Sequence, residues 1–199
     1  MAKGEQILQE QYGTTKRAVS FYKNQMLHYL NDQMIEFIAN QAMVFIATAD
    51  SNGNCDSSFR AGLVGFVRVI DNKTLIYPEY RGNGVMASLG NIVENPYIGL
   101  MFIDFFEHYI GLHINGKASI KDDKQLSSLK IDEKIWDDIR EKEQDRAERW
   151  VIIEVDEAYI HCSKHIPKLK KLDKTIYWGT DDEKQKSGDF FRAKHSKKD

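Results

Sequence analysis

A loop with the residue types of an anion-binding site follows one short apolar run of the chain. The segment YPEYRGNGVMASLGNIVENP, residues 77–96, places Arg81, two glycines and Ser88 between a strand-like run and a helix-like run. The first amide groups of a helix have no partner within it, and the helix dipole is positive there, so phosphate binds readily at a helix start. Gly82 and Gly84 allow the backbone to approach a ligand closely, and a guanidinium matches phosphate oxygens.

An ordinary turn explains the same segment. Glycine motifs match by chance at high rates, and Gly-Asn-Gly after a strand is commonly a turn into a helix. From the pattern alone the ordinary turn is the simpler interpretation, and a phosphate site is the alternative. Arg60, at the end of a neighbouring predicted strand, would reach the same place if the sheet closes on itself.

Apolar spacing predicts the elements that position this loop. Residues 5–42 have helical spacing, including a helix over 15–30 and a last helix capped by Asn31 or Asp32. Charged residues 121–149 also have helical spacing, and the helix after the loop extends to Glu94. Seven strands are predicted, and an Asn-Gly turn joins the first two. They cover residues 43–49, 55–60, 65–70, 74–78, 97–103, 109–120 and 150–162.

Short strands with a single inserted helix predict an antiparallel barrel. The run MVFIATA, residues 43–49, is apolar almost throughout, which is typical of a strand buried on both faces. Gly111 and Gly116 in the long strand predict a bend or a close approach by another group.

Length and composition predict one globular domain. The chain has 199 residues, of which 42% are apolar and 29% charged. We expect helices over 1–42, a barrel core over 43–166, and a tail over 167–199 that packs on the barrel or on a partner subunit. No apolar run reaches the roughly 18 residues of a membrane span, and the polar N-terminus does not resemble a signal peptide. Two cysteines make no disulfide framework, so we expect a cytoplasmic protein without a membrane partner.

Basic residues concentrate at the C-terminus. Residues 163–199 carry 11 Lys/Arg and 6 Asp/Glu, whereas the rest of the chain carries 17 and 24. A basic tail can attract nucleic acid, and a regulatory module of that kind would bind with a steep salt dependence. Because acids are interleaved with the bases and no recognition motif accompanies them, a solvated terminus is the better interpretation.

Several motifs in combination resemble those of a known family. The run FIATADSNGNCDSSFRAGLVGFVRVIDNKTLIYPEYRGNGVMASLGNIVENPYIGLMFIDF, with GLHINGKASI and YIHCSKHI after it, resembles the pyridoxamine 5′-phosphate oxidase-like flavoproteins. The resemblance covers residues 43–166. It implies a mainly β, α+β fold, the FMN-binding split β-barrel, with an antiparallel sheet and peripheral helices. It also implies a homodimer with FMN in two clefts at the subunit interface.

The resemblance implies a set of cofactor-binding residues. Arg60 matches the arginine on the phosphate side of the flavin, with two serines before it on the same strand. Four further residues fall in the segment that wraps the ribityl phosphate. The implied FMN-binding residues are Ser57, Ser58, Arg60, Pro78, Arg81, Asn83 and Ser88.

Two departures set this chain apart from the true oxidases. Ala87 and Ser88 stand where those enzymes carry an adjacent basic pair, and their C-terminal Arg and His pattern is absent. Oxidation of vitamin B6 is therefore not expected. The resemblance instead implies an FMN-dependent oxidoreductase for an unknown small molecule, with a nicotinamide or another reductant. A non-catalytic protein that stores flavin or binds haem is the alternative. Since flavin accepts hydride without a catalytic side chain, none is assigned.

Histidines and a cysteine gather in the segment HCSKH, residues 161–165. The spacing of His161, Cys162 and His165 matches no zinc pattern, so no metal is expected. At a strand end, Cys162 is expected to be a small buried residue. Lys164 would reach a ligand only in a partner's cleft, which is not the favoured interpretation.

Two further side chains have two interpretations each. His113 alternates with apolar neighbours and faces either the flavin cleft or solvent. Trp178 either covers the flavin ring or, as the favoured interpretation, anchors the terminal segment on the barrel.

Overall fold

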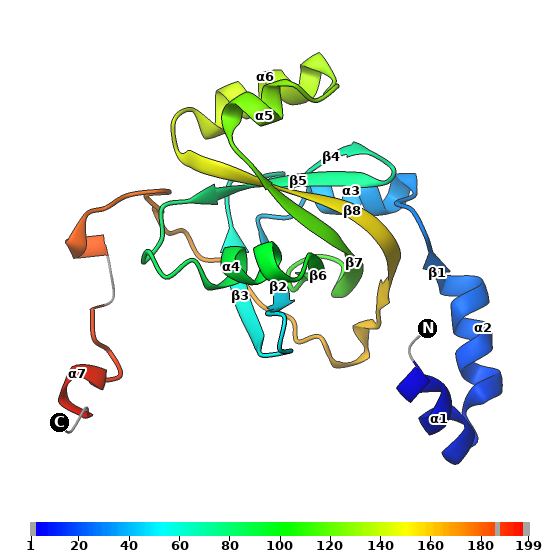
Figure 1. Ribbon diagram of the computed structural model, residues 1–199. Coiled ribbons are helices and arrows are strands. Elements are labelled where there is room, and N and C mark those ends of the chain that lie inside the picture. The colour runs from blue at the N-terminus through cyan, green and yellow to red at the C-terminus, as the bar shows by residue number, and fades with distance from the viewer. Residues whose placement is uncertain (1–2, 186–187, 197–199) are drawn as a thin grey trace.

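One antiparallel sheet organises the chain, as Figure 1 shows. The computed structural model describes residues 3–185 and 188–196, so residues 186–187 and 197–199 of the predicted tail lie outside the described residues. The strands are β1 (Met26–Leu27), β2 (Met43–Ala49), β3 (Cys55–Ala61), β4 (Arg68–Asp71), β5 (Thr74–Tyr80), β6 (Tyr97–Asp104), β7 (Ile110–Lys121) and β8 (Ala147–His161). The helices are α1 (Lys3–Gln11), α2 (Thr15–Gln25), α3 (Asp32–Ala39), α4 (Ala87–Glu94), α5 (Asp123–Ser127), α6 (Glu133–Glu143), η1 (Ser163–His165), η2 (Glu183–Gln185) and α7 (Ala193–Ser196).

The strand order is β3-β2-β6-β7-β8-β5-β4, with β1 added on β8. All pairs are antiparallel, which confirms the predicted sheet type. The main apolar core lies on one face of the sheet and is closed by α3 and α4. A second, smaller core packs Leu126 of α5 and Ile139 of α6 against Ile76 and Trp150 of β5 and β8. Among the described residues, no helix is both long and apolar enough to cross a membrane.

The prediction that β2 is buried on both faces is wrong. Its side chains alternate, with Val44, Ile46 and Thr48 buried and the others at least partly accessible. On the second face, Phe45 packs against Phe59 of the edge strand β3, with ring centroids 5.5 Å apart. By contrast, β5 is buried on both faces along most of its length, because α5 and α6 cover its outer side.

Several predicted boundaries shift for local reasons. The helix predicted over 15–30 ends at Gln25, where the chain becomes extended and pairs with β8. The helix predicted over 121–149 is two helices, because Asp122 and Asp132 each accept a backbone N–H and start a new one. The strand predicted over 65–70 begins only at Arg68. Asn31 caps α3 as predicted, accepting the amide of Met34 at 2.9 Å.

Glycines in β7 stand where the neighbouring strand comes closest. A Cβ on Gly116 would lie 2.1 Å from the carbonyl oxygen of Glu154, which leaves no room for a side chain. The register between β7 and β8 shifts at this point, which is a bulge. A Cβ on Gly111 would likewise meet the carbonyl oxygen of Phe102 at 2.7 Å. The predicted close approaches are confirmed at both positions.

Asp104 closes the connection between β6 and β7. Its carboxylate accepts the backbone amides of Phe106, Glu107 and His108 at 2.8–3.0 Å, and the ring of His108 at 2.9 Å. Burial alone would raise the pKa of Asp104, but these hydrogen bonds outweigh it and lower the pKa from 3.8 to about 2. The turn is therefore held by an ionised carboxylate.

Folding stability is expected to depend on this carboxylate in acid. A carboxyl whose folded-state pKa is depressed stabilises the fold above its unfolded-state pKa, and this contribution is lost as the pH falls through 4 towards about 2. The shift corresponds to about 2 kcal/mol. Urea unfolding at pH 6 and pH 3 should show a smaller acid destabilisation for Asp104→Asn than for the parent. The exposed Asp173→Asn variant is the control, and equal acid losses in Asp104→Asn and the parent would contradict this account.

Candidate functional site

A cavity of about 1060 Å³ opens between the edge strand β3, the end of β5 and the start of α4. The loop at 81–86 forms one side, and residues 176–181 of the C-terminal tail form another. Asp56, Ser58 and Arg60 of β3 alternate with more exposed residues and line the cavity, and Phe59 and Ala61 line it as well. The lining residues are Asp56, Ser58–Ala61, Glu79–Leu89, Glu148, Arg149 and Ile176–Asp181.

Five of the seven residues implied by the resemblance line this cavity. They are Ser58, Arg60, Arg81, Asn83 and Ser88. Ser57 does not line it, because it lies between two inward-facing residues of β3 and is exposed on the other side. Pro78 does not line it either, because it alternates with Tyr77 and Glu79 and is buried opposite Trp150 of β8. The loop with Arg81 and the strand with Arg60 therefore line the same cavity.

Arg60 lies inside the cavity and is held by a buried carboxylate. Its Nε donates to Oε1 of Glu79 at 2.8 Å, and its Nη1 donates to the carbonyl oxygen of Phe59 at 3.3 Å. Glu79 is 7% exposed. Tyr77, two residues before it on the same face of β5, is fully buried, and its hydroxyl makes no hydrogen bond. Burial raises the pKa of Tyr77, and the charge of Glu79 raises it further. The paired guanidinium and carboxylate of Arg60 and Glu79 therefore line the cavity, and the buried Tyr77 hydroxyl is outside its lining.

The start of α4 carries no side-chain cap. Met86 precedes the helix with a φ of 55°, in the left-handed region. Ser88 donates its hydroxyl to Oδ2 of Asp56 at 2.7 Å, so this hydroxyl is already engaged by a carboxylate. Asn83 accepts the amide of Val85 at 3.0 Å and thereby shapes the loop. Residues 86–89 at this helix start line the cavity, with the Ser88–Asp56 pair among them.

The tail reaches the cavity through a turn at residues 177–180. The amide of Thr180 donates to the carbonyl oxygen of Tyr177 at 3.2 Å, and Gly179 has a φ of +71°, which a turn of this kind requires. Trp178 packs against Tyr80, with ring centroids 6.0 Å apart and ring planes at 36°. The indole therefore both anchors the tail and lines the cavity, so the two interpretations of Trp178 are compatible.

Carboxylates accompany the arginines of the cavity. Arg81 pairs with Asp181 of the tail at 3.1 Å, with both side chains more than half exposed. Arg149 pairs with Glu148 at 3.3 Å. The lining contains three arginines and four Asp or Glu residues. An anionic ligand would share these guanidinium groups with carboxylates. Sequence reasoning found Arg60 and Arg81 but missed Arg149 and the acids.

His113 and the segment HCSKH lie away from this cavity. Nε2 of His113 is 2.9 Å from Nδ1 of His161, and the His113 ring stacks on Tyr159. Burial lowers the pKa of His113, and the neighbouring His161 lowers it further. His113 is thus half-buried beside another histidine rather than directed at the cavity. The prediction that Cys162 is buried is wrong, because η1 begins directly after it at the surface. Among residues 3–185 and 188–196, no three His, Cys, Asp or Glu side chains gather as a metal site would need.

Comparison with known families decides the relationship that these features suggest. Residues 30–162, two thirds of the chain, match the model of the pyridoxamine 5′-phosphate oxidase family. The chain belongs to that family. The match includes every strand from β2 to β8 and each of the seven implied FMN-binding residues. Its members share the split β-barrel, which is the fold of this sheet. No curated protein sequence matches the chain significantly.

Several solved structures have a similar fold and align with this chain over most of their own length. The crystal structure of a single-residue variant of HupZ from Group A Streptococcus matches with a TM-score of 0.50 and 21% identity, over 66% of this chain and 98% of HupZ. A second HupZ structure gives 0.49 and 21%, over 66% and 94%. General Stress Protein 26 from Bacillus anthracis gives 0.43 and 18%, over 63% and 89%. At these identities the likeness concerns the fold. The family match at residues 30–162 does not include α1, α2 or the tail.

Proposed function

We propose that this protein is an FMN-binding oxidoreductase that acts on a small molecule, with a nicotinamide as its electron donor. The observation that carries the proposal is the convergence of Arg60, Arg81 and the uncapped start of α4 on one cavity, in a member of this family. Guanidinium groups and free helix amides are the groups that bind a phosphate ester.

The residues of the cavity fit FMN. A guanidinium has five N–H donors, and the hydrogen bonds of Arg60 to Glu79 and Phe59 leave it capacity for a phosphate oxygen. Tyr80 and Trp178 provide aromatic surface for a planar ring. The volume of about 1060 Å³ is at the upper end of cofactor sites, which typically span roughly 300–1,000 Å³.

Arg60 and Arg81 would hold the phosphate, and Trp178 would cover the ring. When bound, FMN accepts and donates hydride equivalents. The chain's own residues orient the cofactor and exclude water, and no side chain is required as an acid or base. Among the described lining residues there is no histidine or cysteine, the proximal ligands in most haem proteins, and this favours flavin over haem.

We propose that two copies of the chain associate, with the cofactor at their interface and the cytoplasm as their compartment. The accessible face of β2 and β3, with Phe45 and the 54% exposed Phe59, supports a self-association surface, because such apolar surface is commonly covered in proteins. The tail turn would then lie beside the same interface.

Purified protein is expected to carry or take up FMN and to show a flavin absorption spectrum. Addition of NADH or NADPH without oxygen should bleach the spectrum, and an electron acceptor should restore it with turnover. Bound flavin that neither nucleotide reduces would point to storage instead of catalysis. A colourless protein that does not take up FMN would overturn the proposal.

A further inference from the structure

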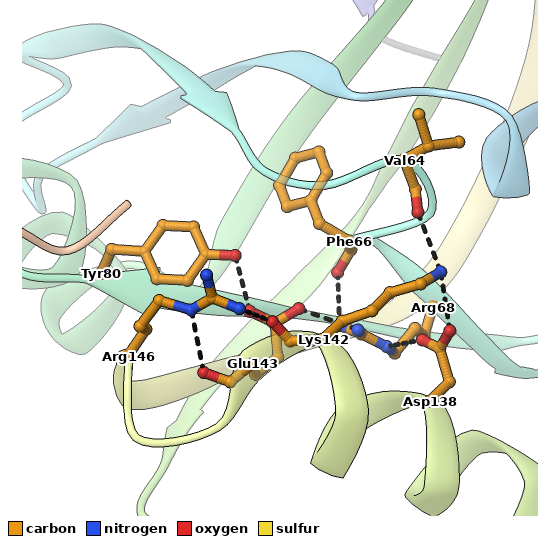
Figure 2. A network of polar contacts seen from close by, with 8 residues as sticks. All are labelled: Val64, Phe66, Arg68, Tyr80, Asp138, Lys142, Glu143 and Arg146. Carbon is orange, nitrogen blue, oxygen red and sulfur yellow. Dashed lines mark hydrogen bonds and ion pairs between the residues drawn. The ribbon is translucent and has the colours of Figure 1, made fainter. Parts of the chain in front are cut away.

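A buried ionic network joins α6 to the end of β5, next to the cavity (Figure 2). Glu143, the last residue of α6, is 1% exposed. Its carboxylate accepts Nη2 of Arg68 at 2.8 Å and the hydroxyl of Tyr80 at 2.6 Å. Arg68 is itself buried and also donates to Asp138 at 2.7 Å and to the carbonyl oxygen of Phe66 at 3.0 Å. Glu143 lies outside the cavity, yet it is bonded to a residue that lines it.

The hydrogen bond between Tyr80 and Glu143 has a fixed direction. Burial raises the pKa of Tyr80, and the adjacent Glu143 carboxylate raises it further. The phenol is therefore protonated at neutral pH and is the donor to the carboxylate. A 2.6 Å bond from a hydroxyl to a carboxylate is of the short, charge-assisted kind. This bond holds the Tyr80 ring in one position at the wall of the cavity.

The two side chains before Arg81 belong to different networks, because consecutive residues of a strand face opposite sides, and a bulge in the pairing with β8 lies at the same point. Glu79 pairs with Arg149 of β8, but Tyr80 pairs with Ala147, so one residue of β8 is skipped. Bulges commonly redirect side chains beside binding sites. Here Glu79 is bonded to Arg60, whereas Tyr80 is bonded to Glu143. The chain is thus fixed at two consecutive residues directly before it enters the loop that begins with Arg81.

The C-terminal end of α6 also supports the tail segment that pairs with Arg81. Arg146, three residues after Glu143, donates to the carbonyl oxygens of Lys142 and Glu143. Gly179 of the tail turn lies against Arg146, because a Cβ on it would be 3.4 Å from the Arg146 carbonyl oxygen. Arg81 directly follows Tyr80, which is bonded to Glu143. Its partner Asp181 comes two residues after Gly179, which lies against Arg146. Both partners of the ion pair are therefore close in sequence to residues held by the C-terminal end of α6.

We propose that Glu143 is a positioning residue for the phosphate end of the cofactor site, acting through Tyr80 on Arg81. This inference rests on the proposed function, because it assigns Arg81 to the phosphate. Without the Glu143 bond, the Tyr80 ring and the first residue of the loop gain freedom. Ordering them again on binding then weakens the grip on the phosphate more than it weakens recognition of the ring, which Trp178 would also contact.

The hydroxyl of Tyr80 is the group to remove. Tyr80→Phe keeps the ring and its contact with Trp178 but deletes the bond to Glu143. FMN affinity is expected to fall about tenfold. The affinity for riboflavin, which lacks the phosphate, should fall clearly less, because the aromatic ring and its contact with Trp178 are kept. In an Arg81→Ala background, Tyr80→Phe should weaken FMN no more than it weakens riboflavin, because both changes act on one phosphate contact. Tyr97→Phe, at an exposed tyrosine outside the cavity, is the matched control.

A second variant keeps the test decisive if Tyr80→Phe unfolds. Glu143→Gln retains an acceptor for the hydroxyl but loses the charge, and it should also lower the ratio of FMN to riboflavin affinity. Circular dichroism establishes that each variant is folded, and fluorescence titration with FMN and riboflavin gives the ratio.

The outcomes separate this inference from the proposed function. A parent protein that binds no FMN overturns both. A parent that binds FMN, with Arg81→Ala weakening it but Tyr80→Phe and Glu143→Gln leaving the ratio unchanged, overturns the positioning role alone. Equal losses for FMN and riboflavin would also overturn it, since they indicate a purely structural role.

Discussion

FMN affinity is expected to fall about tenfold in Arg81→Ala and about a hundredfold in Arg60→Ala, because a hydrogen bond to a charged group contributes roughly 1.5–3 kcal/mol. The Arg60 side chain is 22% exposed and that of Arg81 is 56% exposed, so solvent screens Arg60 less. Arg60→Ala also leaves the Glu79 carboxylate without its partner beside the incoming phosphate, and the repulsion adds to the loss. Fluorescence titration of each variant with FMN provides the measurement.

Riboflavin separates loss of the phosphate contact from loss of the site. Both arginine variants should bind riboflavin nearly as the parent does, because the ring contacts with Tyr80 and Trp178 remain. Arg140→Ala is the matched control for Arg81, since its side chain is 57% exposed and ion-paired but lies outside the cavity. If both arginine variants retained FMN as tightly as the parent, the phosphate would lie elsewhere. Glu79→Gln combined with Arg60→Ala tests whether the unpaired Glu79 carboxylate accounts for the larger loss of FMN affinity in Arg60→Ala.

Most of the barrel was predictable because its signals are local. Alternating side chains mark the strands, and Asn52-Gly53 marks the first hairpin, whose glycine has a φ of +84°. The loop with Arg81 and its glycines follows β5 directly and lines the cavity. Arg60 lines the same cavity, because the cavity lies between β3, the end of β5 and the start of α4.

The acids of the site illustrate what local patterns miss. Glu79 carried a usable signal, because it is spaced two residues from Tyr77 and four from Leu75, on the face of the strand that is directed at the core. Asp181 carried none, since its partner Arg81 lies a hundred residues earlier and the tail has no periodic pattern. Glu143 looked like one charge among many in a polar helix, yet it is almost fully buried. Only the packing of α6 over β5 distinguishes it from its exposed neighbours.

Replacing Arg68 by methionine is expected to destabilise the protein by about 3–5 kcal/mol, because it leaves Glu143 as an uncompensated buried charge. The Arg68 side chain is 5% exposed, and methionine keeps much of its apolar volume, so the lost pairing dominates. Urea unfolding followed by circular dichroism measures the change. Arg140→Ala breaks a fully accessible pair and should change stability by less than about 1 kcal/mol. An unfolding midpoint for Arg68→Met equal to that of the parent would contradict a stabilising role for the ion pair between Arg68 and Glu143.

The double variant Arg68→Met with Glu143→Leu should recover part of that stability, since an apolar pair of similar volume often replaces a buried ion pair without loss. It removes the acceptor of the Tyr80 hydroxyl at the same time. If Glu143 positions the phosphate end of the site, this protein will be more stable than Arg68→Met and still discriminate poorly between FMN and riboflavin. Stability and phosphate recognition would then move in opposite directions, which a role in folding alone does not produce. If stability and the preference for FMN over riboflavin both recovered, the network would stabilise the fold without positioning the phosphate end of the site.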